Sequence, residues 1–469
     1  MDTAIKYSDI YLEIPTDVIQ IEELKIVEEL NEHGKAYAVI LTDDKDKFES
    51  MNDLNTSIEV RIAFKKDDRV LDTFVGFPTK ITIKSIEDIF NIELELKSKS
   101  FALDWEKKKR SFQNIDNPYS NLFKQIVEGY PGASVFDGAS KGALQGVPMI
   151  MYEETPYEFL KRVASKLGAK LVTNVRSSNP MITIGKQRGD DFDQKTIEYQ
   201  MTNEAGNFLK AEINYGSWKQ EEKIHYTIES TYEYNLYDKL LYEEITFTVV
   251  KKETKLVRGI IVFTYWLLKE SGVKQDLIIN EKSQGVSIEG KVLDVSVDRV
   301  KLHLIIDKEQ SVKEAYFYKC ETLYSNEGAT GFYSSFEKGE RVYLYLPKGD
   351  LEEGYVTHAK RLDGETNIKT QDPKVKYYSN NRGKELMLSP SEFQVTSTNG
   401  MILINMDQKD GIEITSSDDI LIKTNDWALV KGKEIALRAG SEILLATKSS
   451  NIIVDENIDF KAVGVVTGV

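Results

Sequence analysis

The stretch that decides the fold lies near the end of the chain, where GIEITSSD (411–418), DILIKTND (419–426), EIALRAGS (434–441) and EILLATKS (442–449) share one pattern. In each unit two aliphatic residues alternate with other residues, and a polar turn follows. An alternation with a period of two is typical of a strand that buries one face. The repetition of these units at a step of eight or nine residues therefore predicts a stacked β-solenoid or β-prism.

The aliphatic positions of these units are the expected core of the repeat. Burying two aliphatic side chains contributes roughly 3–6 kcal/mol, whereas ordering the backbone of one unit costs roughly 8–16 kcal/mol. One chain supplies a single face per unit, so three chains are needed to close the core without free edges. The repeat therefore predicts an intertwined homotrimer; the alternative is an ordinary antiparallel meander with an accidental spacing. The predicted trimer core is Ile404, Ile412, Ile414, Ile420, Ile422, Ile435, Leu437, Ile443, Leu445, Ile452 and Val454.

The composition limits the class of protein. The chain has 469 residues, 41% of them hydrophobic and 29% charged, which is typical of a soluble protein with several domains. Its 61 basic and 76 acidic residues give a net charge of −15, so we expect no nucleic-acid partner. The first residues predict no signal peptide, and we expect assembly in a bacterial cytoplasm. The strongest apolar stretch, Leu256 to Leu268, is too short to span a bilayer.

Helix signals appear in only one part of the chain. Asn117 and Pro118 are the expected N-cap and first residue of one helix. Thr155 to Glu158 form a capping box for a second helix, which Gly168 is expected to end. Strand patterns surround both helices, so the fold class is mainly β with a small α+β part. The predicted domains are a first β domain (1–100), a helical insert (101–175), a second β domain (176–280), an OB-fold barrel of five strands (281–362), a linker with short extended pieces (363–400) and the prism (401–469).

No group of residues predicts catalysis. Cys320 has no histidine near it in the sequence, and we expect it to be a buried structural thiol. The four histidines are far apart, and paired carboxylates such as Glu153–Glu154 lie in turn-rich stretches where we expect them to be solvated. The chain is therefore predicted to be no enzyme and to have no cofactor-binding residue and no metal-binding residue. The histidines are His33, His225, His303 and His358.

Several segments, taken in order, resemble a known family, that of VgrG-type spikes of type VI secretion, the hub and spike proteins of contractile phage tails and R-type bacteriocins. SFALDW (100–105) with the residues up to 113 is similar to the segment before the family's first helix. ETPYEFLKRVA (154–164) resembles the family's "EsxxeFLxRLa" helix. EGKVLDV (289–295) and RVKL (299–302) resemble the opening of its barrel, and KGERV (338–342) and GYV (354–356) its later strands. The resemblance covers essentially the whole chain.

The resemblance implies a homotrimer on the axis of a contractile injection system, which is a phage tail, a phage tail-like bacteriocin or a secretion system. Its two β domains and helical insert would form a baseplate hub that contacts the tail tube and baseplate proteins. The OB-fold barrel and the prism would form a tail spike that points to the target cell envelope for membrane puncturing. The particle would act outside the producing cell or by injection. The family shares no enzymatic activity, so the implied role is that of a structural protein.

The last residues of the chain predict an interaction surface at the tip of the spike. Val465, Val466 and Val469 of three chains would form an apolar patch at the tip, where we expect a tip cap or effector protein to dock.

A second class of protein is the alternative: a trimeric tail fibre or adhesin that binds or processes a cell-surface glycan. The short octads leave no room for a glycan-cleaving groove, and a fibre does not explain the two helices.

Overall fold

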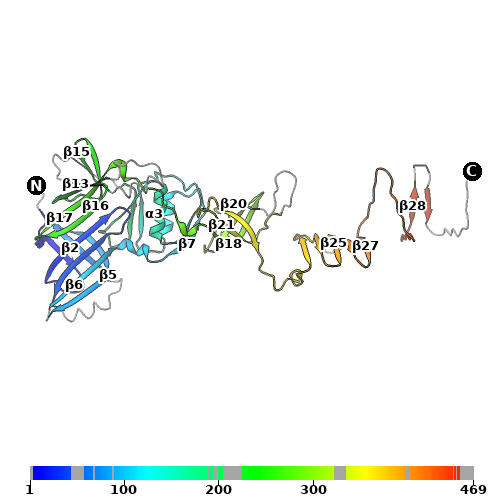
Figure 1. The fold of residues 1–469 in the computed structure, drawn as a ribbon, viewed down its shortest axis with the longest axis horizontal. Coiled ribbons are helices and arrows are strands. Elements are labelled where there is room, and N and C mark those ends of the chain that lie inside the picture. Colours follow the sequence, from blue (N-terminus) through cyan, green and yellow to red (C-terminus); the bar gives the residue numbers. More distant parts are fainter. Residues whose placement is uncertain are drawn as a thin grey trace, which may run out of the picture. The chain divides into compact units, whose positions relative to one another are not determined.

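The structure of the chain is a computed structural model, which falls into two compact units, Met1–Arg361 and Leu362–Val469 (Figure 1). Among the helices that the structure describes, none is long and apolar enough to cross a membrane. The described residues are 4–43, 58–66, 69–86, 89–186, 190–193, 199–203, 224–321, 334–397, 401–446, 448–449 and 451–454.

A large sheet forms the start of the first unit, and its main path runs β1-β4-β5-β6-β3-β2-β16-β17-β14-β13. The two strand-rich regions of the sequence meet in it, because β2 pairs with β16 from Lys25↔Lys255 to Glu29↔Lys251. Figure 1 shows the blue strands alongside the green ones. The prediction of a mainly β fold is confirmed, and the two regions share one sheet and one core. The strands are β1 (Ile10–Glu13), β2 (Gln20–Glu29), β3 (Lys35–Thr42), β4 (Val60–Lys66), β5 (Arg69–Ile86), β6 (Ile89–Ser98), β12 (Asp191–Asp193), β13 (Tyr199–Asn203), β14 (Ile224–Ser230), β15 (Lys239–Tyr242), β16 (Ile245–Val257) and β17 (Ile260–Lys269).

The N-terminal segment connects two distant strands of this sheet. Tyr7 donates its backbone N–H to Gly259 O at 2.8 Å, and Ile261 donates to Ile5 O at 2.9 Å. The chain then continues into β1, which pairs with β4. One segment therefore contacts both β4 and the β16–β17 hairpin. The two barrel-like hub domains expected from the sequence are joined in this one sheet.

The helical insert has its own core, built from two helices and short strands. Thr155 caps α3 by accepting from Glu158 N, and Pro156 is its first residue, as predicted. The first helix starts one residue later than predicted, because Pro118, in extended conformation, is the N-cap and Tyr119 the first helical residue. The elements are η2 (Lys99–Asp104), β7 (Lys108–Phe112), α2 (Tyr119–Val127), β8 (Ser134–Asp137), β9 (Met149–Glu154), α3 (Pro156–Lys166), β10 (Leu171–Thr173) and β11 (Met181–Ile184).

A closed five-stranded barrel ends the first unit, with the strand order β18-β19-β20-β22-β21. All five strands expected between residues 281 and 362 are present. Inward side chains such as Val300, Leu302 and Leu304 alternate with outward ones on β19 and are fully buried. The strands are β18 (Val286–Ser296), β19 (Arg299–Leu304), β20 (Phe317–Cys320), β21 (Arg341–Leu346) and β22 (Tyr355–Lys360).

The strands of the second unit have no core of their own. Five of them form an antiparallel sheet in chain order from β23 to β27, and β28 pairs with β29. None of the described residues of this unit is buried. The sheet therefore differs from every sheet of the first unit, since both of its faces are accessible to solvent. The strands are β23 (Lys376–Ser379), β24 (Glu385–Leu388), β25 (Glu392–Ser397), β26 (Ile402–Asp407), β27 (Gly411–Ser416), β28 (Ile443–Ala446) and β29 (Asn451–Val454).

Candidate functional site

The sheet from β23 to β27 has one apolar and one polar face. Directly opposed residues of antiparallel strands point to the same face. In this register Val395 opposes Leu386 and Ile404, and Ile404 opposes Ile414. The other face bears polar residues such as Gln394 in the same strands. Lys376, Ser397 and Ser416 also lie on the apolar face. Its apolar and aromatic residues are Tyr378, Leu386, Leu388, Phe393, Val395, Ile402, Ile404, Met406, Ile412 and Ile414.

This apolar face is exposed although its side chains are large. Ile412 is 70% exposed, and Ile404, Met406 and Ile414 are exposed as well. Within one chain β26 and β27, at the start of the octad region, pair antiparallel as in the meander that the sequence leaves as an alternative, and β23 to β25 extend the same sheet upstream. A meander in a soluble protein normally buries its apolar face, but among the described residues of this unit nothing covers it. An exposed apolar face of this kind is typical of an interaction surface.

The predicted core residues of the prism lie in three kinds of position. Ile404, Ile412 and Ile414 are on the apolar face. On β28 and β29, Ile443 opposes Val454 and Leu445 opposes Ile452. Four others lie on exposed backbone between β27 and β28 that forms no strand in the single chain, namely Ile420, Ile422, Ile435 and Leu437. The tip residues Val465, Val466 and Val469 lie outside the described residues.

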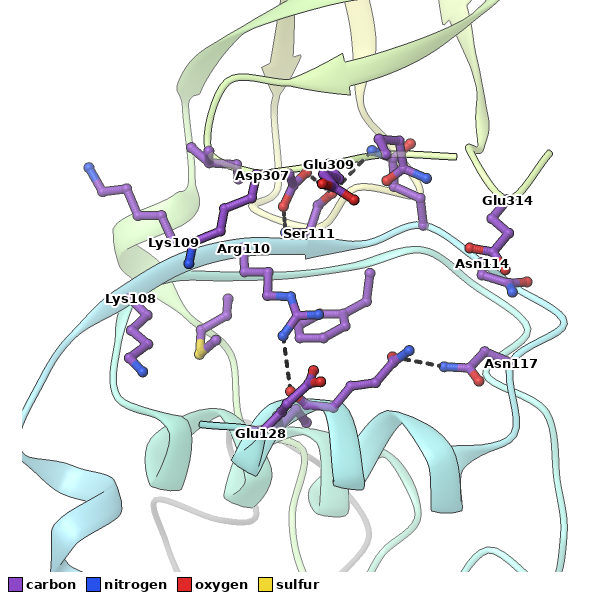
Figure 2. Close-up of a pocket in the computed structure, with 18 of the residues that line it drawn as sticks. Lys108, Lys109, Arg110, Ser111, Asn114, Asn117, Glu128, Asp307, Glu309 and Glu314 are labelled. Atoms are coloured by element: carbon purple, nitrogen blue, oxygen red, sulfur yellow. Dashed lines mark hydrogen bonds between the residues drawn. The ribbon is translucent and has the colours of Figure 1, made fainter. Parts of the chain in front are cut away.

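A second site lies where the helical insert meets the barrel (Figure 2). Asp307 accepts from the backbone N–H of Ser111 at 2.7 Å and from its hydroxyl at 2.5 Å. Burial raises the pKa of the Asp307 carboxyl, and the hydrogen bonds from Ser111 oppose that rise. Gln113 donates to Leu302 O at 3.2 Å. These contacts tie β7 to the strand end and loop of the barrel.

An open cavity of about 1050 Å³ adjoins this junction. Figure 2 shows Arg110 pointing from β7 to α2, where it donates to Gln125 O at 3.0 Å, while Lys109 lies on the barrel side. The lining carries both signs of charge in equal measure, so it selects no ligand by net charge. The charged residues are Lys107, Lys108, Lys109, Arg110 and Lys308 against Glu106, Glu128, Asp307, Glu309 and Glu314.

Glu154 corrects one prediction from the sequence. It is only 5% exposed and not solvated as expected, because Arg162 of α3 reaches it with two N–H donors at 3.1 and 2.6 Å. The same guanidinium donates to Ile150 O at 2.5 Å. Ile150 in turn packs into the core of the barrel. The buried ion pair thus fixes β9 between α3 and the barrel.

Sequence reasoning also missed a buried polar cluster around His33. The His33 Nδ1 lies 2.9 Å from Ser100 Oγ, and its Nε2 lies 3.4 Å from Asp104 Oδ2. Asp104 also accepts from the hydroxyl of Thr155. Although these residue types occur in hydrolases, Ser100 is 1% exposed and out of reach of a substrate. The cluster joins the turn between β2 and β3, η2 and the N-cap of α3, and burial lowers the pKa of His33.

The remaining candidate residues are in the barrel and the large sheet. Cys320 is half-buried and not fully buried as expected, and burial raises the pKa of its thiol to about 11. His303 and His358 lie on barrel strands, as predicted, and His225 lies on β14. Across the part of the chain that the structure describes, no three histidine, cysteine or acidic side chains come together as metal ligands.

Comparisons with known proteins define the class of fold. No protein-family model matches the chain, and no curated protein matches it. Among solved structures, the E. coli c3393 protein, a component of the type VI secretion system with structural similarity to T4 bacteriophage tail proteins gp27 and gp5, is 14% identical with a TM-score of 0.52. The match covers 75% of this chain and 100% of that one. A chain of the lidless PdpA-VgrG complex is 9% identical with a TM-score of 0.57, over 87% of this chain and 98% of that one.

These matches confirm the family resemblance at the level of the fold. The chain has the mainly β fold of VgrG-type and T4-type tail hub proteins. A second structure of the Francisella complex, the half-lidded form, matches 87% of each chain with the same TM-score of 0.57. At 9 to 14% identity the likeness concerns the fold, and the role of this chain must be argued from its own residues.

Proposed function

We propose that this chain is a structural hub and spike of a contractile injection machine, which connects a tail tube and baseplate to a membrane-piercing tip. The observation that carries the proposal is the combination of the hub fold with the exposed apolar face of β23 to β27. A hub fold supplies a platform for tube and baseplate proteins. An uncovered apolar strand face supplies a surface that becomes stable only in an assembly.

The barrel is assigned to the OB type in this proposal. Its strands lie in the order first, second, third, fifth and fourth, with the fourth closing onto the first. A Greek-key barrel of five strands has the architecture of an OB-fold. Its outer surface carries both acidic and basic residues. Lys360 and Glu289, for example, form an ion pair at 2.6 Å. The barrel then acts as a rigid adaptor between the hub and the spike.

The spike is proposed to be a homotrimer. Fully burying one aliphatic side chain contributes about 1.5–3 kcal/mol, and in a single chain Ile412 and Ile414 are mostly exposed. Three copies that face one another would bury them together with the aliphatic residues of the following octads. The same arrangement would remove the open edges of the strands. The octads 401–469 would thus form a rod suited to transmitting force.

The partners follow from this arrangement. Tail tube and baseplate proteins would contact the hub, and the spike would meet the target cell envelope. A cap or effector protein would bind the tip formed by Val465, Val466 and Val469. The role proposed for the chain is mechanical, as the family resemblance implies. Deleting residues 463–469 tests the tip, since particles that keep every tip component would contradict docking there.

Imaging of intact particles tests the proposal as a whole. The chain, labelled with a bound antibody fragment on the hub, should lie on the particle axis beneath the tube. A position at the periphery would contradict the proposal and support the tail fibre or adhesin instead. Light scattering of the purified chain is the matching solution measurement. A mass of three chains is expected, and a mass of one chain at micromolar concentration would contradict the trimer.

A further inference from the structure

We propose that a small aromatic pocket beside the β15–β16 hairpin binds the side chain of a lysine or arginine that a partner protein presents. The pocket is an open cavity of about 80 Å³ in the large sheet of the first unit. Three aromatic rings and one carboxylate line it, from Tyr226, Tyr242, Phe247 and Glu243. This inference goes beyond the proposed hub and spike, because it concerns one binding site and the chemistry of its ligand.

Three strands bring the aromatic rings together. Tyr226 lies on β14, Tyr242 is the last residue of β15, and Phe247 lies near the start of β16. Because β14 and β16 both pair with β17, these strands flank it on either side. The rings of Tyr226 and Phe247 meet edge to face, with their centroids 4.8 Å apart. Phe247 is buried in the core, and the two tyrosines pack against that core, so the pocket walls are held in place.

The turn of the hairpin supplies the carboxylate. Tyr242 opposes Ile245, which leaves Glu243 and Glu244 as a two-residue turn. Both have a positive φ, of 47° and 62°. Turns of this kind prefer Asn-Gly or Asp-Gly, so two glutamates are an unfavourable choice for closing the hairpin. Residues in sparsely populated conformations cluster at functional sites, which motivates a role for this turn in binding.

The chemistry of the pocket favours a cation. The face of an aromatic ring attracts an ammonium or a guanidinium group. The described lining contains no basic residue. Among the described residues, neither Glu243 nor Glu244 has an ion-pair partner. An aliphatic side chain would withdraw the Glu243 carboxylate from water and offer it no compensating contact, which is unfavourable.

The size of the pocket favours one side chain over a free ligand. Sites for drug-sized ligands and cofactors measure about 300–1,000 Å³, whereas this cavity of about 80 Å³ admits only the end of a side chain. Ile245 also lines the pocket and is 40% exposed, so it would contact the partner around the inserted group. The net charge of −15 favours a partner with a basic surface.

Saturation-transfer NMR of the full-length chain tests the site, since this method detects weak binding of small probes. The probes are N-acetyl-arginine amide and tetramethylammonium, and N-acetyl-leucine amide is the apolar control. The first pocket variant is Glu243→Gln. Its matched control is Glu244→Gln, which makes the same change of charge in the same turn but outside the pocket lining. A second pocket variant, Tyr242→Leu, keeps the carboxylate and removes one ring.

The parent chain should transfer saturation to N-acetyl-arginine amide, and tetramethylammonium should displace it. Glu243→Gln and Tyr242→Leu should each weaken binding about fivefold, whereas Glu244→Gln should change it less than about twofold. Equal saturation of N-acetyl-leucine amide, or equal losses in the two glutamine variants, would overturn the inference. A lack of saturation in the parent chain would overturn it as well, as would occur if a second copy filled the pocket.

Carboxylate labelling with a carbodiimide, read by mass spectrometry, tests whether a protein fills the pocket in assembled particles. Glu243 should be labelled far less in particles than in the purified chain. Equal labelling in both would contradict a protein occupant. None of these outcomes affects the proposed hub and spike, because that proposal is tested by the position of the chain in the particle.

Discussion

Replacing Arg162 with methionine tests how the hub holds the barrel. Arg162 is 3% exposed and donates to both oxygens of Glu154 and to the carbonyl of Ile150. Methionine fills a similar volume but has no donors. The carboxylate of Glu154 would then be buried without its partner, and Ile150 would lose the bond that fixes its backbone beside the barrel core.

The magnitude follows from the burial of both partners. Removing one member of a buried pair costs about 3–5 kcal/mol, because the other charge is left unpaired. At about 1.4 kcal/mol for each factor of ten, a cost of about 3–5 kcal/mol should make local opening of β9 roughly 100 to 4,000 times more frequent. The more exposed ion pair between Lys166 and Asp350 is expected to contribute less. Lys166 lies 3.7 Å from Asp350, which is 45% exposed, so Lys166→Met should cost less than about 1 kcal/mol.

Hydrogen exchange read by mass spectrometry measures this opening segment by segment. Peptides covering β9 and the adjoining barrel strand β18 should exchange faster in Arg162→Met, while peptides from β3 and β6 should not change. The double variant Arg162→Met with Glu154→Met should recover much of the protection, since neither charge then remains buried. Unchanged exchange in β9 of the single variant, or a double variant less protected than the single one, would refute the reasoning.

Three further predictions concern other parts of the molecule. Ile412→Asp should lower the mass measured by light scattering from three chains towards one, whereas Glu413→Gln on the opposite face should leave it unchanged. Burial lowers the pKa of His33. The neutral imidazole therefore contributes fully to stability above the unfolded pKa of about 6.5, and this contribution is lost as the pH falls through the lower folded pKa. The melting temperature of His33→Gln should consequently fall less steeply with acid than that of the parent. Because the pKa of the Cys320 thiol is about 11, labelling by a disulfide reagent at pH 8 should be slow in the folded chain and fast in urea, and equal rates would contradict its burial.

Local signals in the sequence were sufficient to predict the elements that are determined by residues close together in the chain. The α3 helix begins where Thr155 and Glu158 cap each other, and both partners lie within one turn of the helix. The barrel strands follow from alternation along each strand, as in the buried Val300, Leu302 and Leu304. The octads likewise show their period directly. The neighbours that decide these features are only a few residues away in the chain.

The tertiary structure decided whatever depends on residues far apart in the chain. The pairing of β2 with β16 joins two regions that the sequence separates by more than 200 residues, and no local pattern selects that partner. Glu154 looks solvated beside Glu153 until α3 places Arg162 against it. The face to which Val395 points depends on the register of its strand with β24 and β26. Alternation along the sequence marks two faces of a strand, but only pairing aligns the faces of neighbouring strands into one apolar surface.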